Sequence, residues 1–151
     1  MASPFSLDNP VFSKFAFYST VVLSKTLCMG ELTALYRTRR QAFANEEDVA
    51  LFARSRHTET TTTDVSVERV RRCHLNDLEN VLPFVLVGLM YVSTKPGATE
   101  ASRVFQIFAA SRLLHTVAYL IPLPQPTRAV TYLTGYGATF FMVYKIIKAI
   151  Y

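Results

Sequence analysis

The sequence contains little cysteine and little charge, and both shortages restrict what the protein can be. Its two cysteines, Cys28 and Cys73, are too few to staple a secreted domain, and neither lies in a Cys-x-x-Cys or Cys/His metal spacing. Glycosylation sequons of the form Asn-x-Ser/Thr are also lacking. We therefore expect a reducing environment and no metal. Charged residues make up 18% of the chain against 50% hydrophobic residues, which excludes a disordered protein, and 151 residues exclude a large multidomain enzyme.

The apolar residues are gathered into four long blocks. The mean hydropathy is +0.21 although the chain carries 16 lysines and arginines. A helix needs about 20 apolar residues to cross the hydrocarbon of a membrane, and each block approaches that length. We predict an all-α integral membrane protein, a bundle of four transmembrane helices in a single domain over residues 1–151. The predicted helices span residues 10–36, 67–93, 102–120 and 127–150.

Local signals mark the ends of these blocks and orient them. Asn9 is suited to cap the first helix and Pro10 to occupy its first turn, while three prolines at residues 122–126 break the helical pattern between the last two blocks. The polar segment 37–66 is expected to be a mobile loop. Because arginine is densest there and at the start of the second block, the positive-inside rule places this loop in the cytosol and both termini in the lumen.

Ionisable residues occur inside the predicted spans, where a charge costs on the order of 2.5–3.5 kcal/mol at the helix centre. At about 100° per residue, Arg72, Asn76 and Glu79 share one stripe of the second helix, and Arg71 and His74 share a neighbouring stripe. These stripes predict a polar cavity.

The third predicted helix carries Arg112, His115 and Tyr119 on one face, at spacings of three and four residues. Structural interpretations remain open beside a functional one. Glu79 and Arg112 can form an intramembrane ion pair that serves only assembly, and His115 can be a packed polar residue.

Several arginines with a glutamate, an asparagine and a histidine match a small polyanion that carries an amine. Guanidinium groups bind carboxylates through a rigid fork, and a glutamate pairs with an ammonium group. Glutathione has these features, and a nearby arginine would stabilise the thiolate of its thiol, whose ordinary pKa is about 8.5. Nucleotides, acidic lipids and fatty-acid carboxylates also attract arginines. A nucleic-acid partner is excluded, because the basic residues lie beside membrane spans and not on a soluble face.

At these residues the sequence resembles the MAPEG family, integral membrane proteins of eicosanoid and glutathione metabolism. The matching segments are residues 42–45 with Glu47 and Asp48, residues 67–80 with Pro83 and Phe84, residues 115–120, and residues 122–129. The resemblance implies a homotrimer with glutathione bound between subunits near the cytosolic side. It also implies that Arg128 holds or activates the sulfur. The implied glutathione-binding positions are Arg37, Arg71, Arg72, His74, Asn76, Glu79, Arg112 and Tyr119.

Several positions depart from other members of the family, and three of them bear on the activity or its regulation. Leu75 stands where the prostaglandin E synthases of the family have an arginine, and Ala129 replaces a serine that follows their sulfur-stabilising arginine. Both departures favour a glutathione transferase. Val49 follows Asp48 where related mammalian transferases carry a reactive cysteine, so activation by thiol modification at this position is not expected.

The resemblance therefore implies an enzyme of the endoplasmic reticulum membrane or the outer mitochondrial membrane, with glutathione as co-substrate. We expect it to conjugate the glutathione thiolate to lipophilic electrophiles and to reduce lipid hydroperoxides. Two alternatives remain: glutathione-dependent prostaglandin E synthesis, and a non-catalytic membrane protein that binds lipid or a partner protein.

Overall fold

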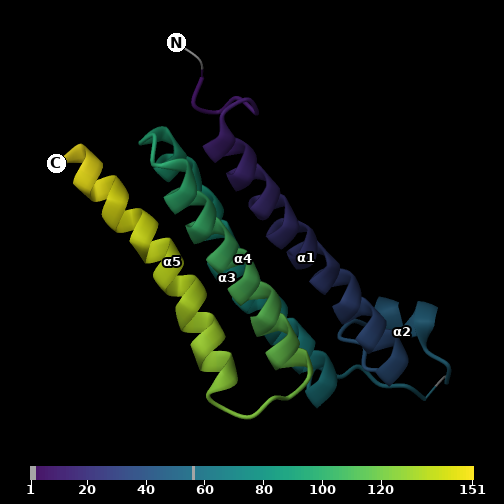
Figure 1. Cartoon of the computed structure of the whole chain (residues 1–151). Helices are drawn as coiled ribbons and strands as arrows, with labels where there is room; N and C mark the ends of the chain where they lie inside the picture. Colours follow the sequence, from purple (N-terminus) through teal and green to yellow (C-terminus); the bar gives the residue numbers. More distant parts are fainter. Residues whose placement is uncertain (1–2, 56) are drawn as a thin grey trace.

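The fold is a bundle of long helices, seen here in a computed structural model that describes residues 3–55 and 57–151. Within these residues the chain forms five helices: α1 (Pro10–Arg40), α2 (Glu46–Phe52), α3 (Val65–Ser93), α4 (Ala98–Leu120) and α5 (Thr127–Ile150). The four long helices run side by side, with α3 and α4 between α1 and α5 (Figure 1). The start of α1 and the end of α5 lie at one end of the bundle, and α2 lies at the other.

Side-chain caps explain where the first and third helices begin. Asn9 Oδ1 accepts a hydrogen bond from the Val11 backbone N–H at 3.0 Å, and Pro10 occupies the first turn of α1. Asp64 Oδ1 accepts from the N–H groups of Ser66 and Val67, both at 2.9 Å, at the start of α3. These bonds satisfy amide groups that would otherwise lack a partner at a helix end.

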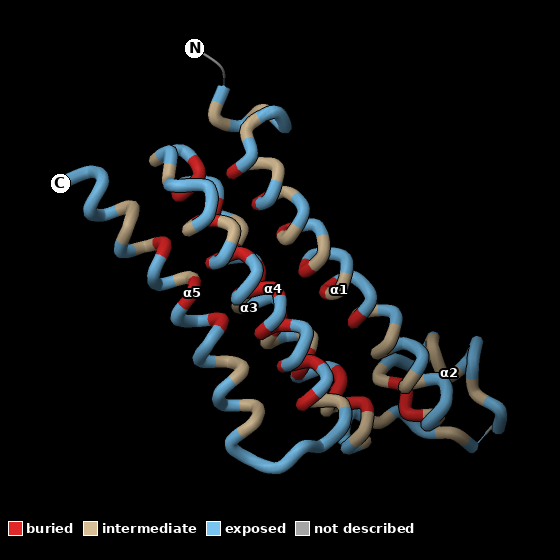
Figure 2. The backbone as a smooth tube through the Cα atoms, viewed as in Figure 1, coloured by how far each residue is buried: buried red, intermediate tan, exposed pale blue. Residues whose placement is uncertain are grey.

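The core of the bundle is aromatic. Phe84 of α3 and Phe108 of α4 stack with ring centroids 3.7 Å apart, and Phe15 of α1 packs against Phe84 and Phe105. Buried residues line the inward sides of α1, α3 and α4, whereas most of α5 is exposed (Figure 2). Many exposed side chains on the long helices are large and apolar, which is the surface expected of a protein that meets lipid or other subunits.

The segment 37–66 differs from the mobile loop that the sequence predicted. Helix α1 continues to Arg40, and α2 forms within the segment, with three acidic residues in its first turn that suit a helix N-terminus. Ala42 and Phe43 are buried, and the Thr61 N–H donates to the Phe43 carbonyl at 2.6 Å. The polar composition obscured this anchor because it consists of only two residues.

Helix α4 also begins earlier than the predicted residue 102. The connection from α3 is a short turn that includes Lys95 with a φ of 54°, and α4 starts at Ala98 directly after Gly97. By length and apolar composition, one of the described helices, Val65–Ser93, is suited to span a membrane. At about 1.5 Å per residue its 29 residues extend roughly 43 Å. The count of four spans stays a prediction.

Candidate functional site

The predicted site residues lie in the half of the bundle where α1 ends, α3 begins and α4 connects to α5, and they extend from that end to the middle of α3. Figure 1 shows these helix ends close together. They come from all four long helices. Arg37 lies on α1, Arg71, Arg72, His74, Asn76 and Glu79 on α3, Arg112 and Tyr119 on α4, and Arg128 on α5. Shared location alone does not make a site, so the contacts of each group decide what it can do.

Arg112 lies fully buried between α3 and α4, with none of its surface exposed. Its Nη2 donates to Asn76 Oδ1 at 2.6 Å and to Asp77 Oδ1 at 3.0 Å. The sequence interpretation considered Glu79 as the carboxylate partner of Arg112, and the structure corrects this to Asp77. The reason is helical geometry: Asp77 points into the bundle and is fully buried, whereas Glu79 lies on the exposed face of α3.

A second cation completes this group. Lys25 of α1 forms an ion pair with Asp77, and its Nζ donates to Thr116 Oγ1 at 2.9 Å. The Thr116 hydroxyl donates to the Arg112 carbonyl at 3.1 Å. We call Lys25, Asp77 and Arg112 the buried charge cluster. Counted as two cations and one carboxylate, it carries one net positive charge, and buried charges are normally paired.

The cluster leaves strong hydrogen-bond donors free. Arg112 Nε and Nη1 are buried and have no hydrogen-bond partner among the described residues. On the α5 side, a Cβ atom added to Gly135 would lie 3.4 Å from Arg112 Cδ and 2.6 Å from Ser111 Oγ, so the absence of a side chain lets α5 approach closely. An anionic group is the ligand that would satisfy both the free donors and the net charge.

Arg128 and Tyr119 meet where α4 connects to α5. The Arg128 Cζ lies 5.1 Å from the centroid of the Tyr119 ring, within the range of a cation–π contact. His115 Nδ1 lies 3.2 Å from the Arg128 carbonyl oxygen and 3.1 Å from Thr131 Oγ1. Because the carbonyl accepts only, a proton on Nδ1 would be donated to it. His115 is thus packed against the start of α5, and the half-buried Arg128 guanidinium rests on Tyr119.

Glu79 lines a small cavity of about 150 Å³ between α3 and α5. Tyr132 and Tyr136 line the same cavity and stack with ring centroids 5.7 Å apart. Arg128, Tyr132 and Tyr136 recur every four residues, so they form one ridge of α5 with Arg128 at its start. The cavity therefore has a carboxylate on one wall and aromatic rings on the other.

The remaining predicted residues lie around the first turns of α3, apart from the groups above. Arg71 binds Glu68 through Nε at 2.9 Å and Nη2 at 3.0 Å, and Arg72 Nε donates to the Glu68 carbonyl at 3.2 Å. Arg37 Nη1 donates to the Ala42 carbonyl at 3.3 Å, at the end of α1.

Contacts therefore unite only part of the predicted set. They join Asn76 to Arg112 and Tyr119 to Arg128. His74 lies half-buried beside α1, where a Cβ on Gly30 would lie 3.7 Å from its Cε1. Within the described residues, 3–55 and 57–151, no hydrogen bond or ion pair joins Arg37, Arg71 or Arg72 to the buried charge cluster.

Two residues of the cluster, Lys25 and Asp77, were not among the predicted site residues. A signal was available for each: Lys25 interrupts the first apolar block, and Asp77 lies within the polar block that supplied five predicted residues. In the residues that the structure describes, no group of three or more His, Cys, Asp or Glu side chains is placed to hold a metal ion.

Comparison with known proteins places this geometry in a family. The model of the MAPEG family matches residues 15–148. Human microsomal glutathione S-transferase 1 is 46% identical over 144 residues, which cover 95% of this chain and 93% of that protein, and the rat protein of the same name is 42% identical over the same share. Human prostaglandin E synthase is 36% identical over 126 residues, which cover 83% of this chain and 81% of that protein. The family predicted from the sequence is thereby confirmed: the chain belongs to the MAPEG family and is membrane-associated.

Proposed function

We propose that this protein is a membrane-bound glutathione S-transferase that conjugates the glutathione thiolate to lipophilic electrophiles. The observation that carries the proposal is the buried Arg112 with two free donor nitrogens, at the end of the bundle where Arg128 lies beside Tyr119. The relatives at 42–46% identity over 95% of the chain are named as transferases of this kind. Relatives named prostaglandin E synthase are less similar, at 35–37%, which favours transfer over isomerisation.

Arg128 is the residue that we assign to the sulfur. A guanidinium group stabilises a thiolate, so it raises the concentration of the nucleophile at neutral pH. In conjugation to a chlorinated aromatic ring, the thiolate sulfur forms a bond to the ring carbon and chloride leaves with the electron pair of its bond. The thiol proton passes to solvent. The face of the Tyr119 ring contacts the Arg128 guanidinium group and holds it in position.

The same thiolate accounts for the proposed reduction of lipid hydroperoxides. Its sulfur attacks the terminal peroxide oxygen, the O–O bond breaks, and the alkoxide takes a proton and leaves as an alcohol. The sulfur of the first glutathione is now a sulfenic acid. The thiolate of a second glutathione attacks this sulfur, the S–O bond breaks, and hydroxide leaves and takes a proton, which yields glutathione disulfide and water. Two thiols are oxidised and one peroxide is reduced, so the electrons balance without a metal or another cofactor.

The other predicted residues are assigned to holding the tripeptide. Arg112 offers Nε and Nη1 to a carboxylate, while Asp77 and Lys25 fix the orientation of its guanidinium as positioning residues. Glu79, on the wall of the α3–α5 cavity, is suited to pair with the α-amine. We assign carboxylate and amide binding to the remaining predicted residues, which are exposed or half-buried. They are Arg37, Arg71, Arg72, His74, Asn76 and Tyr119.

A homotrimer is the assembly we propose, with glutathione between subunits. The exposed face of α3 supports it, because Leu75, Leu82 and Leu86 are 49%, 58% and 51% exposed there. Arg72 and Glu79 lie on the same face, and lipid would not tolerate these charges. A neighbouring subunit would cover the leucines and leave a polar space for glutathione.

We propose the endoplasmic reticulum membrane as the location, with the outer mitochondrial membrane as a second site. The end that carries α2 and the arginines of α1 and α3 would face the cytosol, with four spans and both termini in the lumen. This orientation gives the site direct access to cytosolic glutathione, and the membrane concentrates apolar electrophiles beside it.

The proposal is tested with detergent-purified protein by conjugation of glutathione to a chlorinated dinitrobenzene and by reduction of a lipid hydroperoxide. The parent is compared with Arg128→Ala and with Arg54→Ala, a matched control that removes an exposed arginine from the segment 37–66. We expect kcat to fall at least tenfold in Arg128→Ala, glutathione affinity to change less, and Arg54→Ala to match the parent.

Three outcomes would contradict the proposal. Equal losses of kcat and of glutathione affinity in Arg128→Ala would make Arg128 a simple binding residue. A folded parent with neither activity and no measurable glutathione binding would move the protein to the non-catalytic alternative. Conversion of prostaglandin H to prostaglandin E as the main reaction would establish the isomerase instead.

A further inference from the structure

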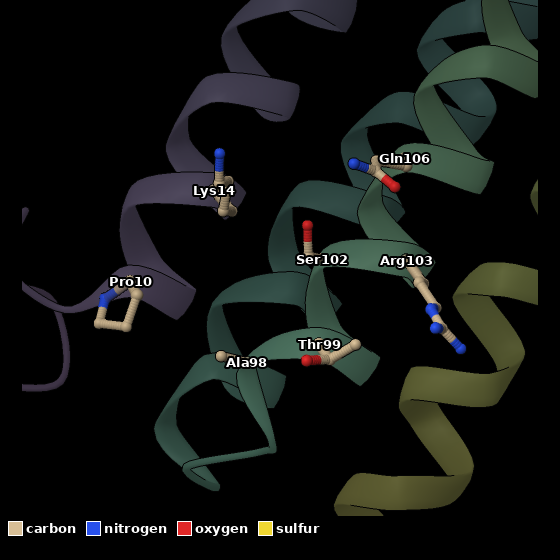
Figure 3. A pocket seen from close by; sticks show the side chains of 7 residues that line it. All are labelled: Pro10, Lys14, Ala98, Thr99, Ser102, Arg103 and Gln106. Carbon is tan, nitrogen blue, oxygen red and sulfur yellow. The ribbon is translucent and has the colours of Figure 1, made fainter.

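A second polar feature lies at the opposite end of the bundle from the candidate site. A groove of about 380 Å³ runs between the first turns of α1 and α4 (Figure 3). We call it the α1–α4 groove. Lys14 lines it from α1, and Ser102, Arg103 and Gln106 line it from α4. The groove thus contains two cations and further hydrogen-bonding side chains.

The two cations lack an internal counter-charge. Neither Lys14 nor Arg103 takes part in an ion pair among the described residues. Glu100, in the first turn of α4, is engaged elsewhere: Lys145 Nζ lies 3.0 Å from its carboxylate, and the Tyr91 hydroxyl donates to it at 2.8 Å. The α1–α4 groove therefore has an uncompensated positive charge, which favours an anion.

The depth of the groove along the helices indicates where it meets the membrane. Lys14 lies four residues after the start of α1, and Arg103 lies five residues after the start of α4. At about 1.5 Å per residue, both are roughly 6–8 Å inside their helix ends. In a bundle that crosses the bilayer, this is the level of the lipid headgroups.

Apolar side chains continue from the groove toward the middle of the bundle. Phe17 lies one turn beyond Lys14 and is 60% exposed, and Ile107 lies one turn beyond Arg103 and is 47% exposed. Cations at the rim with exposed apolar side chains one turn deeper match a molecule with an anionic head and a hydrocarbon tail. A free inorganic anion would use only the rim.

We propose that the α1–α4 groove binds an anionic phospholipid, with Lys14 and Arg103 as the cations that attract its phosphate and an acyl chain along the apolar side chains one turn deeper. In Figure 3 the Arg103 side chain extends from α4 toward α5, so it would contact the phosphate from the far side of α4 or after a change of rotamer. Ser102 and Gln106 add hydrogen bonds to the phosphate or glycerol oxygens. The groove is remote from the glutathione site, so this inference stands on membrane association and not on the proposed transferase chemistry.

The absence of tryptophan from the sequence allows a direct test. Phe17→Trp introduces a single tryptophan beside the proposed acyl chain. The variant is placed in phosphatidylcholine bilayers that contain a small fraction of a lipid with brominated acyl chains, which quench nearby tryptophan. In one sample the brominated lipid is phosphatidylglycerol, and in the other it is phosphatidylcholine. We expect stronger quenching by the brominated phosphatidylglycerol, which indicates a preference of the groove for this lipid over phosphatidylcholine. This preference should fall about fivefold in Lys14→Gln and about fivefold in Arg103→Gln.

Controls separate this site from general charge effects. Lys148→Gln removes an exposed lysine of α5 at the same end of the bundle but outside the groove, and should leave the preference unchanged. Thermal unfolding of each variant verifies the fold, and each of the two single substitutions remains informative if the other variant does not fold. Excess inorganic phosphate should not remove the preference.

Three results would overturn the proposal. Equal quenching by the two brominated lipids would show that the groove does not select an anionic headgroup. An equal effect of Lys148→Gln and Lys14→Gln would reduce the preference to overall charge. Loss of the preference on addition of inorganic phosphate would identify a free anion as the occupant.

Discussion

Replacement of Asp77 by asparagine tests the central claim about the buried charge cluster. Asp77 is fully buried and is the carboxylate that both Lys25 and Arg112 contact. Asparagine has nearly the same shape and keeps an acceptor oxygen, but it removes the charge. The cluster would then carry two uncompensated cations. Loss of one partner of a buried ion pair lowers the free energy of unfolding by about 3–5 kcal/mol. In a chain of this size each kcal/mol lowers Tm by roughly 2–4 °C. We therefore expect the Tm of Asp77→Asn to be lower than that of the parent by on the order of 10 °C.

The assay is thermal unfolding in detergent, followed by the circular dichroism of the helices. Glu68→Gln serves as the matched control, because it breaks the exposed ion pair with Arg71 and should leave Tm unchanged. Lys25→Met in the Asp77→Asn background removes one of the two cations, and should recover part of the lost stability. This rescue distinguishes an electrostatic effect from a change of shape.

An Asp77→Asn protein with the Tm of the parent would refute the reasoning, because neutralising the buried carboxylate between two cations would then have cost no stability. A double variant less stable than Asp77→Asn alone would also refute it. In that case Lys25 would stabilise the protein through its contact with Thr116 or through packing, and not by charge compensation.

Further substitutions separate packing from binding. Gly88→Ala should destabilise the protein by about 1–3 kcal/mol, because the added Cβ would overlap the Phe15 ring. Gly97→Ala should not destabilise it, because the space around Gly97 is open. Thermal unfolding of both variants measures this difference. Glu79→Gln should weaken glutathione binding about tenfold or more through loss of a charge-assisted hydrogen bond, yet leave Tm near that of the parent, because Arg112 keeps its carboxylate partner. A large loss of stability with unchanged glutathione binding in isothermal titration would instead make Glu79 a structural residue.

Much of the architecture could be predicted from periodicity and local signals. The Asn9 cap, the first-turn Pro10 and the proline-rich break at residues 122–126 have local causes, and the structure uses them near the predicted positions. The segment 37–66 was interpreted less well. Its anchor, Ala42 and Phe43, is too short to produce a hydropathy signal and becomes visible only when the end of α1 and α2 fold around it.

In the candidate site, too, the features with local causes could be predicted from the sequence, and those that depend on how helices pack could not. Spacings of three and four residues correctly aligned Arg112, His115 and Tyr119 on one helix, because a helical repeat is a property of the chain itself. The partner of Arg112 is on another helix, and sequence spacing contains no information about the rotation of α3 relative to α4. That rotation buries Asp77 and exposes Glu79, two residues apart in the chain.

The sequence by itself determined the all-α class, the family and the end of the molecule at which the polar groups gather, because these follow from composition, periodicity and motif. Tertiary structure alone decided which charges meet. Lys25 and Asp77 are 52 positions apart in the numbering, and only the packing of α1 against α3 brings their side chains together. Ion pairing inside a bundle depends on how helices rotate and approach, which is set by the fit of apolar side chains such as Phe15 against Gly88 and not by the charged residues themselves.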